Sequence, residues 1–159
     1  QDRDGALDTV EMCTRRAASC SNISLRVQRI APALAPLPGG DVLLIGGSER
    51  AAAGTSEMLY VASTGRFEPA ANAGERRSGH TATGLKDGRV LVVGGATGGP
   101  STRAEIYDPA ARAWTAAASP SEARRGHVAV ALNDGAVLIL GGVDQDGAPV
   151  RFAELWQPE

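Results

Sequence analysis

The stretch that decides the fold is Arg77–Gly95, RSGHTATGLKDGRVLVVGG. It reads as a polar corner, a short strand, an Asp-Gly turn, an apolar second strand and a glycine pair. The pattern occurs three times, and the repeats follow one another after 48 and then 47 residues. The glycine pairs that align them are Gly46-Gly47, Gly94-Gly95 and Gly141-Gly142. A period of about 40 to 50 residues indicates a repeat architecture.

The best-defined repeat predicts four short strands, over residues 80–85, 89–93, 103–107 and 113–116. Asp87-Gly88 and Asp108-Pro109 are the turn signals between them. Each segment is β-branched or apolar and too short for a helix. Four such strands form one antiparallel sheet, which is weakly stable alone and must stack on a neighbour.

The same pattern predicts strands in the flanking repeats, and no helix is expected. The expected ranges are 30–37, 42–45, 56–61 and 66–68 before the best-defined repeat, and 127–132, 137–140 and 151–156 after it. Residues 1–27 resemble the third and fourth strands of a preceding unit. The sequence therefore predicts a partial unit over 1–27, full units over 28–75 and 76–122, and a unit over 123–159 that lacks its fourth strand.

Composition excludes some classes of protein. The net charge of -2 gives no overall electrostatic case for nucleic-acid binding. Apolar runs such as 90–93 are far too short to span a bilayer. Arginine occurs 15 times and lysine once, which suggests a GC-rich bacterial source. The chain begins at Gln1, so we expect either a cleaved leader or an excised piece.

Two cysteines, Cys13 and Cys20, lie seven residues apart. A local disulfide is the favoured interpretation, because the two ends of a short hairpin can bring them within bonding range. The alternative is a pair of buried free thiols in a reducing cytosol. A metal site has too few ligands. If the bridge forms, the compartment is oxidising, and we expect a periplasmic, cell-surface or secreted protein.

Several features together resemble the kelch repeat, the blade of kelch-type β-propellers such as the central domain of galactose oxidase. They are Tyr107-Asp108-Pro109, Trp114, Pro120, Arg124, Gly126-His127 and Gly141-Gly142. The resemblance implies an all-β kelch-type propeller segment. The first full unit departs from it with Pro32 in place of histidine and Phe67 in place of tryptophan, and the partial unit has Cys13 near the tyrosine position.

Propellers close with about four to eight blades, and three periods are too few. Either the remaining blades lie outside this piece, or two or more copies close a ring together. A dimer of half-rings is conceivable, although the surplus third strand at the N-terminus argues against a clean version. The preferred interpretation is a segment of a longer six- or seven-bladed chain. The expected partners are therefore other blades of that chain or another copy.

Repeated residues have a structural interpretation first. The glycine pairs permit close approach and unusual φ angles, and Tyr107 and Trp114 supply apolar area between blades. The four glutamates Glu11, Glu57, Glu105 and Glu154 form a ladder of one residue per unit, expected to bond backbone groups or an arginine. The only histidines, His80 and His127, occupy equivalent positions, where packing or hydrogen bonding explains them better than a two-ligand metal site.

The candidate binding residues lie in loops that should emerge at one mouth of the propeller. Arg29, Arg77 and Arg124 each precede a glycine pair by 17 residues, and Arg76 and Arg125 adjoin two of them. The favoured interpretation is structural, by capping carbonyls or pairing with the repeated glutamate. The functional alternative is a mouth for an acidic peptide or a carboxylated sugar. Asp144 and Asp146 also line this face, where turn chemistry is a better explanation than calcium binding.

The sequence shows no Ser-His-Asp or Cys-His arrangement and no phosphate loop, and GGATGG over 94–99 is not followed by a helix. No position matches the copper ligands of the radical oxidases that share the propeller. We therefore expect no cofactor and a non-catalytic binding module that recognises a protein or a glycan. One alternative is the propeller of a carbohydrate-active enzyme or oxidase whose catalytic residues lie outside this segment. Another is a structural component of a larger surface assembly.

Overall fold

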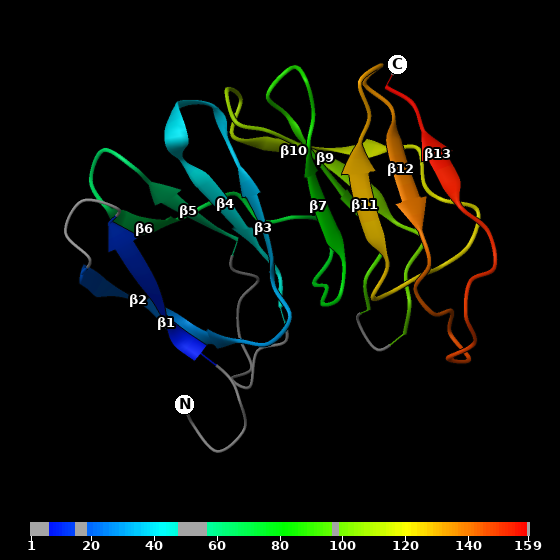
Figure 1. Cartoon of the computed structure of the whole chain (residues 1–159), viewed down its shortest axis with the longest axis horizontal. Coiled ribbons are helices and arrows are strands. Elements are labelled where there is room, and N and C mark those ends of the chain that lie inside the picture. Colours follow the sequence, from blue (N-terminus) through cyan, green and yellow to red (C-terminus); the bar gives the residue numbers. More distant parts are fainter. Residues whose placement is uncertain (1–6, 15–18, 48–56, 97–98, 159) are drawn as a thin grey trace.

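The computed structural model describes residues 7–14, 19–47, 57–96 and 99–158. The described residues form four antiparallel sheets, with two, four, four and three strands in chain order. The sheets stand side by side, as the three larger ones show clearly in Figure 1. This strand inventory matches the one predicted from the repeats, and a single short 3-10 turn, η1 (Pro38–Gly40), is the one helical element described.

The hairpin sheet comprises β1 (Leu7–Thr14) and β2 (Ser19–Arg29). Sheet I comprises β3 (Ala33–Pro36), β4 (Val42–Ile45), β5 (Met58–Val61) and β6 (Arg66–Pro69). Each strand pairs with the next in sequence, so sheet I is a meander. The hairpin sheet occupies the position of the third and fourth strands of a preceding unit, and β2 runs through the predicted boundary after residue 27.

Sheet II comprises β7 (Thr81–Gly84), β8 (Val90–Val93), β9 (Ala104–Asp108) and β10 (Ala113–Ala117). Sheet III comprises β11 (Val128–Ala131), β12 (Val137–Leu140) and β13 (Glu154–Trp156). The predicted strands lie within one or two residues of these bounds, except that β13 begins at Glu154 rather than near residue 151. Sheet III has no fourth strand among the described residues, as the repeat pattern predicted.

The same turn joins the first two strands of each larger sheet. Leu85 N donates to Arg89 O at 2.7 Å, and Leu132 N donates to Ala136 O at 2.7 Å. The corresponding bond in sheet I runs from Leu37 N to the carbonyl of Asp41 at 2.8 Å. Each turn contains a glycine with positive φ, which is why the Asp-Gly and Gly-Gly signals predicted it.

The core lies in the seams between sheets. In the first seam, the apolar face of sheet I (Leu43, Ile45, Leu59) packs against Val90, Val92 and Tyr107 of sheet II. In the second seam, Leu91, Val93 and Ile106 pack against Val137, Ile139 and Trp156 of sheet III. The second strand of each sheet therefore shows alternate residues to opposite neighbours. Because each buried side chain of this size contributes about 1.5–3 kcal/mol, each sheet depends on the sheets beside it.

The hairpin sheet covers the other face of sheet I. Val10 packs with Leu44, Met58 and Phe67, and the Tyr60 hydroxyl donates to Met12 Sδ at 3.2 Å. This is the same seam contact as between the larger sheets, made with fewer strands. Within the described part of the chain, no helix has the length and apolar character that a membrane crossing requires.

Candidate functional site

The loops that enter the first strands carry buried arginines. Arg77 is 2% exposed, and its Nη1 donates to the carbonyls of Gly94 (3.3 Å) and Arg103 (3.2 Å). Its Nη2 forms an ion pair with Glu105 on β9. The other carboxylate oxygen of Glu105 accepts a hydrogen bond from Gly74 N at 3.0 Å. Burial lowers the pKa of Arg77, and the charge of Glu105 opposes that shift.

Arg124 repeats this arrangement one unit later. Its Nη1 lies 3.4 Å from Gly141 O, its Nη2 pairs with Glu154, and Glu154 accepts from Ser121 N at 2.7 Å. Burial alone would raise the pKa of Glu154, but the hydrogen bonds from Ser121 and the charge of Arg124 lower it below its usual value. Each Arg–Glu pair therefore ties the entry loop of a sheet to the ends of its second and third strands.

Arg29 follows the same pattern in part. It is 4% exposed, and its Nη1 donates to Gly46 O. The glutamate ladder, however, differs from the prediction in this unit. Met58 pairs with Leu44 as Glu105 pairs with Val92, so Glu57 lies one residue out of register with the other glutamates. Glu57 is still buried, and burial raises its pKa.

Each glycine pair is bonded to the next sheet. Gly47 N donates to Arg77 O at 2.8 Å, and Gly95 N donates to Arg124 O at 2.9 Å. A Cβ on Gly46 or Gly94 would lie only 2.2 or 2.5 Å from those same carbonyl oxygens. The arginine thus joins its own sheet through its side chain and the preceding sheet through its backbone. We call this contact set the arginine–glycine lock.

The histidines belong to the same contact. A Cβ on Gly46 would lie 2.8 Å from His80 Cε1, and one on Gly94 would lie 3.0 Å from His127 Cε1. His127 Nε2 is 2.9 Å from the Thr81 hydroxyl across the second seam. Burial, with the nearby charges of Arg77 and Arg124, lowers the pKa of His80 to about 3 and that of His127 to about 4. Both rings are therefore neutral at pH 7 and pack between sheets.

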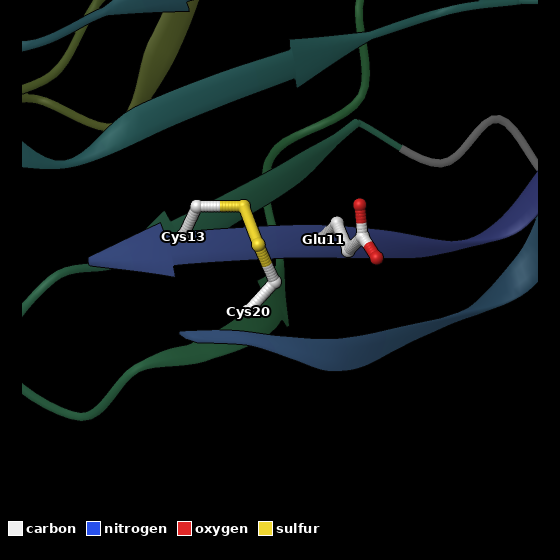
Figure 2. Close-up of side chains that lie close together, drawn as sticks. All are labelled: Glu11, Cys13 and Cys20. Atoms are coloured by element: carbon white, nitrogen blue, oxygen red, sulfur yellow. A yellow bond between two sulfur atoms is a disulfide. The ribbon is translucent and has the colours of Figure 1, made fainter. Parts of the chain in front are cut away.

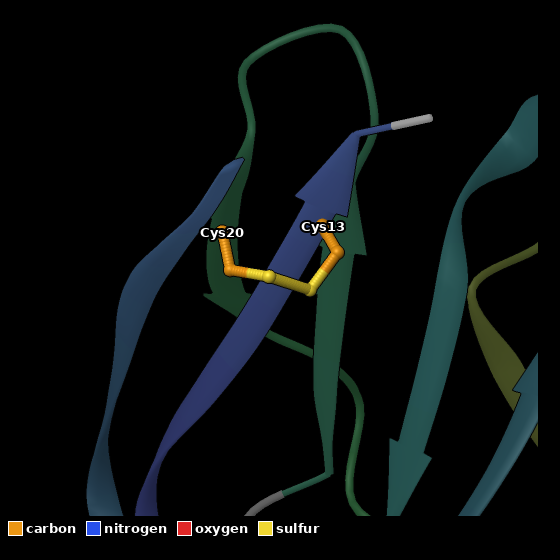
Figure 3. Close-up of a disulfide and its surroundings, with 2 residues drawn as sticks. All are labelled: Cys13 and Cys20. Carbon is orange, nitrogen blue, oxygen red and sulfur yellow. A yellow bond between two sulfur atoms is a disulfide. The ribbon is translucent and has the colours of Figure 1, made fainter. Parts of the chain in front are cut away.

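A cross-strand pair joins the third and fourth strands of each unit. Tyr107 and Trp114 pair in register, with ring centroids 5.1 Å apart, and Trp114 Nε1 donates to Ala71 O at 2.7 Å. Tyr60 and Phe67 form the equivalent pair at 5.4 Å. In the hairpin sheet, the same positions are Cys13 and Cys20, which form a disulfide across β1 and β2 (Figure 3). The covalent bond stands where the other units have an aromatic pair.

Glu11 lies on β1 near the disulfide, and its carboxylate approaches the two sulfur atoms (Figure 2). These three residues are the kind that can hold a metal ion. Because each sulfur is bonded to the other, however, neither offers a thiolate, and the single exposed carboxylate does not make a site. Cys13 and Cys20 thus form the disulfide that the sequence predicted.

The remaining loop residues that the sequence singled out are more open. Arg76 and Arg125 are exposed, each beside a buried arginine. Asp144 is partly exposed, and its Oδ1 accepts from Asp146 N and Ala148 N, both at 2.9 Å. That geometry is a side-chain-capped turn, in agreement with the turn interpretation of these aspartates. The structure therefore places the buried arginines in the lock and leaves Arg76 and Arg125 on the surface.

Sequence reasoning missed the backbone half of the lock. The equal spacing of 17 residues between Arg29, Arg77 and Arg124 and their glycine pairs was visible. The spacing of 31 and then 30 residues from Gly46 to Arg77 and from Gly94 to Arg124 carried the second contact, because these residues meet across the seams. A contact between consecutive units leaves no signal inside a single unit, which is why the glycine amides were not predicted.

Residues 76–121, which span sheet II, match the family model described as Kelch motif. No curated protein matches the chain. With four antiparallel sheets in sequential order and apolar seams between them, the fold is an all-β, partial kelch-type propeller. The fold class expected from the sequence is confirmed, and the motif suggests a protein-interaction or scaffold module.

Proposed function

We propose that this segment is a non-catalytic binding and scaffold module that presents its arginine-bearing loops to an acidic partner. The observation that carries the proposal is a hydrogen-bonded ring of entry loops. Gly79 N donates to Ala31 O at 3.3 Å, and Gly126 N donates to Gly79 O at 2.8 Å. The three entry loops thus form one continuous surface, which we call the mouth.

Two exposed arginines stand on that surface at equivalent positions. Arg76 and Arg125 each adjoin a buried arginine of the lock, so the backbone that carries them is fixed on both sides. A planar guanidinium suits a carboxylate better than an ammonium does, because it can donate two parallel hydrogen bonds. The ligand chemistry is therefore a pair of carboxylates, and an acidic protein segment is the favoured source, with a carboxylated glycan as the alternative.

Replacing both exposed arginines should abolish most of this binding without unfolding the protein. We expect Arg76→Ser with Arg125→Ser to weaken the affinity for an oligoglutamate peptide about tenfold or more, since each charge-assisted hydrogen bond contributes about 1.5–3 kcal/mol. Isothermal titration at low and moderate salt measures the effect, and added salt should weaken the wild-type binding.

Arg66→Ser is the matched control, because Arg66 is also an exposed arginine but lies at the turn between β5 and β6, at the opposite end of the sheets. Its affinity should equal that of the wild type. Equal losses in the control and in the double variant would mean that only overall charge matters, and would contradict a site at the mouth. Binding of a sialylated glycan in preference to the peptide would favour the glycan source.

The uncovered face of sheet III supports the scaffold part of the proposal. Leu140 and Leu155 are 51% and 50% exposed, whereas the equivalent Val93 and Ile106 of sheet II are 1% and 8% exposed. Val130 is likewise 54% exposed and its counterpart Thr83 is 9% exposed. These side chains point the way that sheets I and II point toward their next neighbour. The surface is therefore a blade-docking face.

The polar groups of this face are also waiting for the same contact. A Cβ on Gly141 would meet nothing within 4 Å, unlike one on Gly46 or Gly94. Among the described residues, none accepts a backbone hydrogen bond from Gly142 N, although Gly47 and Gly95 each have one. The partner that fits is another blade of the same repeat, supplied by a longer chain or by another copy, which would bring an arginine carbonyl to Gly142.

The disulfide supports an extracytoplasmic location. Cys13 and Cys20 are both exposed and both on the hairpin sheet, so a reducing cytosol would have ready access to them. Disulfides that persist are typical of oxidising compartments. We therefore place the protein in the periplasm, at the cell surface or outside the cell.

A further inference from the structure

A groove opens along the first seam at the end opposite the mouth. Two adjoining cavities, of about 520 and 370 Å³, share four lining residues. The shared residues are Pro38, Asp87, Gly88 and Arg89. Because the turns between the first two strands of sheets I and II form its rims, the groove is separate from the mouth and from the blade-docking face.

The repeat supplies its own explanation for the opening. Pro38 and Lys86 each lie eight residues before a glycine pair. In the second seam, Lys86 Nζ reaches across and donates to Asn133 O of sheet III. Pro38 is too short to bridge the first seam and has no donor, so its side chain only contacts Gly88 of sheet II. The first seam is therefore open where the second is bridged.

The floor of the larger cavity is apolar, with one polar group in it. Leu37 and Leu59 are each 8% exposed, and Tyr107 is 1% exposed. The Tyr107 ring packs on Trp114, but none of the described residues forms a hydrogen bond with its hydroxyl. A nearly fully buried tyrosine whose hydroxyl has no partner, in the wall of a cavity, points to a ligand that supplies one. Burial raises the pKa of Tyr107, so the hydroxyl keeps its proton and can both donate and accept.

The rim has groups of both signs. Asp41 Oδ1 accepts from Ala62 N at 2.8 Å, and Asp108 Oδ1 accepts from Ala110 N at 2.8 Å, so the second oxygen of each carboxylate faces no printed donor. Asp87 is already paired with Arg89 at 2.7 Å. Arg112 adds a guanidinium near the Tyr107 hydroxyl, where its charge opposes the raised pKa of the phenol.

We propose that this groove binds a neutral sugar ring. Ring hydroxyls donate to the second oxygens of Asp41 and Asp108 and accept from Arg112 and Tyr107, while the carbon-bound hydrogens of the ring lie on Leu37 and Leu59. A neutral polyol matches a site that has both donors and acceptors and little net charge. An ammonium group would be repelled by Arg112, and a carboxylate by the two aspartates.

The test is a titration of the ¹⁵N-labelled full chain with the methyl glycosides of glucose, galactose and mannose. At least one should bind with a Kd of about 1 mM or tighter and shift the amides of residues 107–112 and 37–41. Tyr107→Phe should weaken that binding about tenfold, because the lost hydrogen bond contributes about 1 kcal/mol. Tyr60→Phe is the matched control and should leave it unchanged, since Tyr60 donates to Met12 outside the groove.

Arg112→Ser separates the ligand classes. It should weaken sugar binding, because the sugar accepts a hydrogen bond from the guanidinium. If instead Nα-acetyl-lysine amide binds more tightly than any glycoside, and Arg112→Ser strengthens it, the site takes a cationic side chain and the sugar proposal is wrong. Absence of shifts at residues 107–112 with all three glycosides, in a chain whose spectrum shows it folded, would also overturn it.

Discussion

Arg77→Ala should destabilise the protein by about 3–5 kcal/mol, because it leaves the carboxylate of Glu105 buried and unpaired in the second sheet. The substitution also removes the donors to the carbonyls of Gly94 and Arg103. Chemical denaturation measures the loss as a fall in the unfolding midpoint at unchanged slope. Arg76→Ala is the matched control. Because Arg76 is exposed, its loss should change the unfolding free energy by less than about 0.5 kcal/mol.

A double-mutant cycle distinguishes a paired arginine from one that acts only through packing. Arg77→Met with Glu105→Gln should be less damaging than Arg77→Ala, since the glutamine oxygen still accepts from Gly74 N and no charge remains buried. We expect a coupling of about 1–3 kcal/mol between the two positions. A coupling near zero, or a loss for Arg77→Ala no larger than that for Arg76→Ala, would show that the ion pair does not stabilise the sheet.

Gly94→Ala should be nearly as damaging as the loss of Arg77, for a different reason. The residue has φ +63°, and an added Cβ would lie 2.5 Å from Arg124 O in the next sheet. Left-handed backbone costs an alanine about 1–2 kcal/mol, and overpacking a seam costs about 1–3 kcal/mol more. We therefore expect a total loss of about 3–4 kcal/mol by thermal or chemical unfolding.

Gly141→Ala is the control that the repeat provides. Its φ is +72°, but an added Cβ would meet nothing within 4 Å, because no described sheet covers that side. It should cost only the backbone term of about 1–2 kcal/mol. Equal losses at Gly94 and Gly141 would mean that close approach of the next sheet contributes nothing, which would contradict the seam contacts described above.

Much of the fold followed from the sequence, because the repeat restates it in every unit. A turn signal, a four-residue apolar strand and a glycine pair fix the first two strands, and the tyrosine–tryptophan spacing fixes the third and fourth. The disulfide was predicted by the same frame. Cys13 and Cys20 are seven residues apart, as are Tyr107 and Trp114, and both pairs face each other across neighbouring strands.

The one-residue shift of Glu57 was not predicted. The glutamates were aligned with one another, although Tyr60 follows Glu57 by three residues whereas Tyr107 follows Glu105 by two. A side chain that packs in a seam is held in register by its neighbours, so the aromatic pair sets the alignment and the glutamate moves. Aligning on Tyr60 and Phe67 would have given the correct register.

The binding surfaces were only partly predictable. The sequence placed the arginines at one end of the sheets, but both interpretations of them remained open until their burial was known. The exposed Arg76 and Arg125 differ from their buried neighbours only in direction, and a strand pattern does not specify the direction of a loop side chain. The groove likewise depends on Pro38 failing to reach a residue that lies on another sheet.

The central claim is that each sheet is held by an arginine–glycine lock from the next and that sheet III ends on a free blade-docking face. Amide hydrogen exchange of three glycines tests it most directly. The amides of Gly47 and Gly95 donate to Arg77 and Arg124, so both should exchange slowly, whereas Gly142 should exchange rapidly in the dilute protein and become protected when another blade docks. Rapid exchange at Gly47 and Gly95, or equal protection of all three in a dilute monomer, would contradict the account.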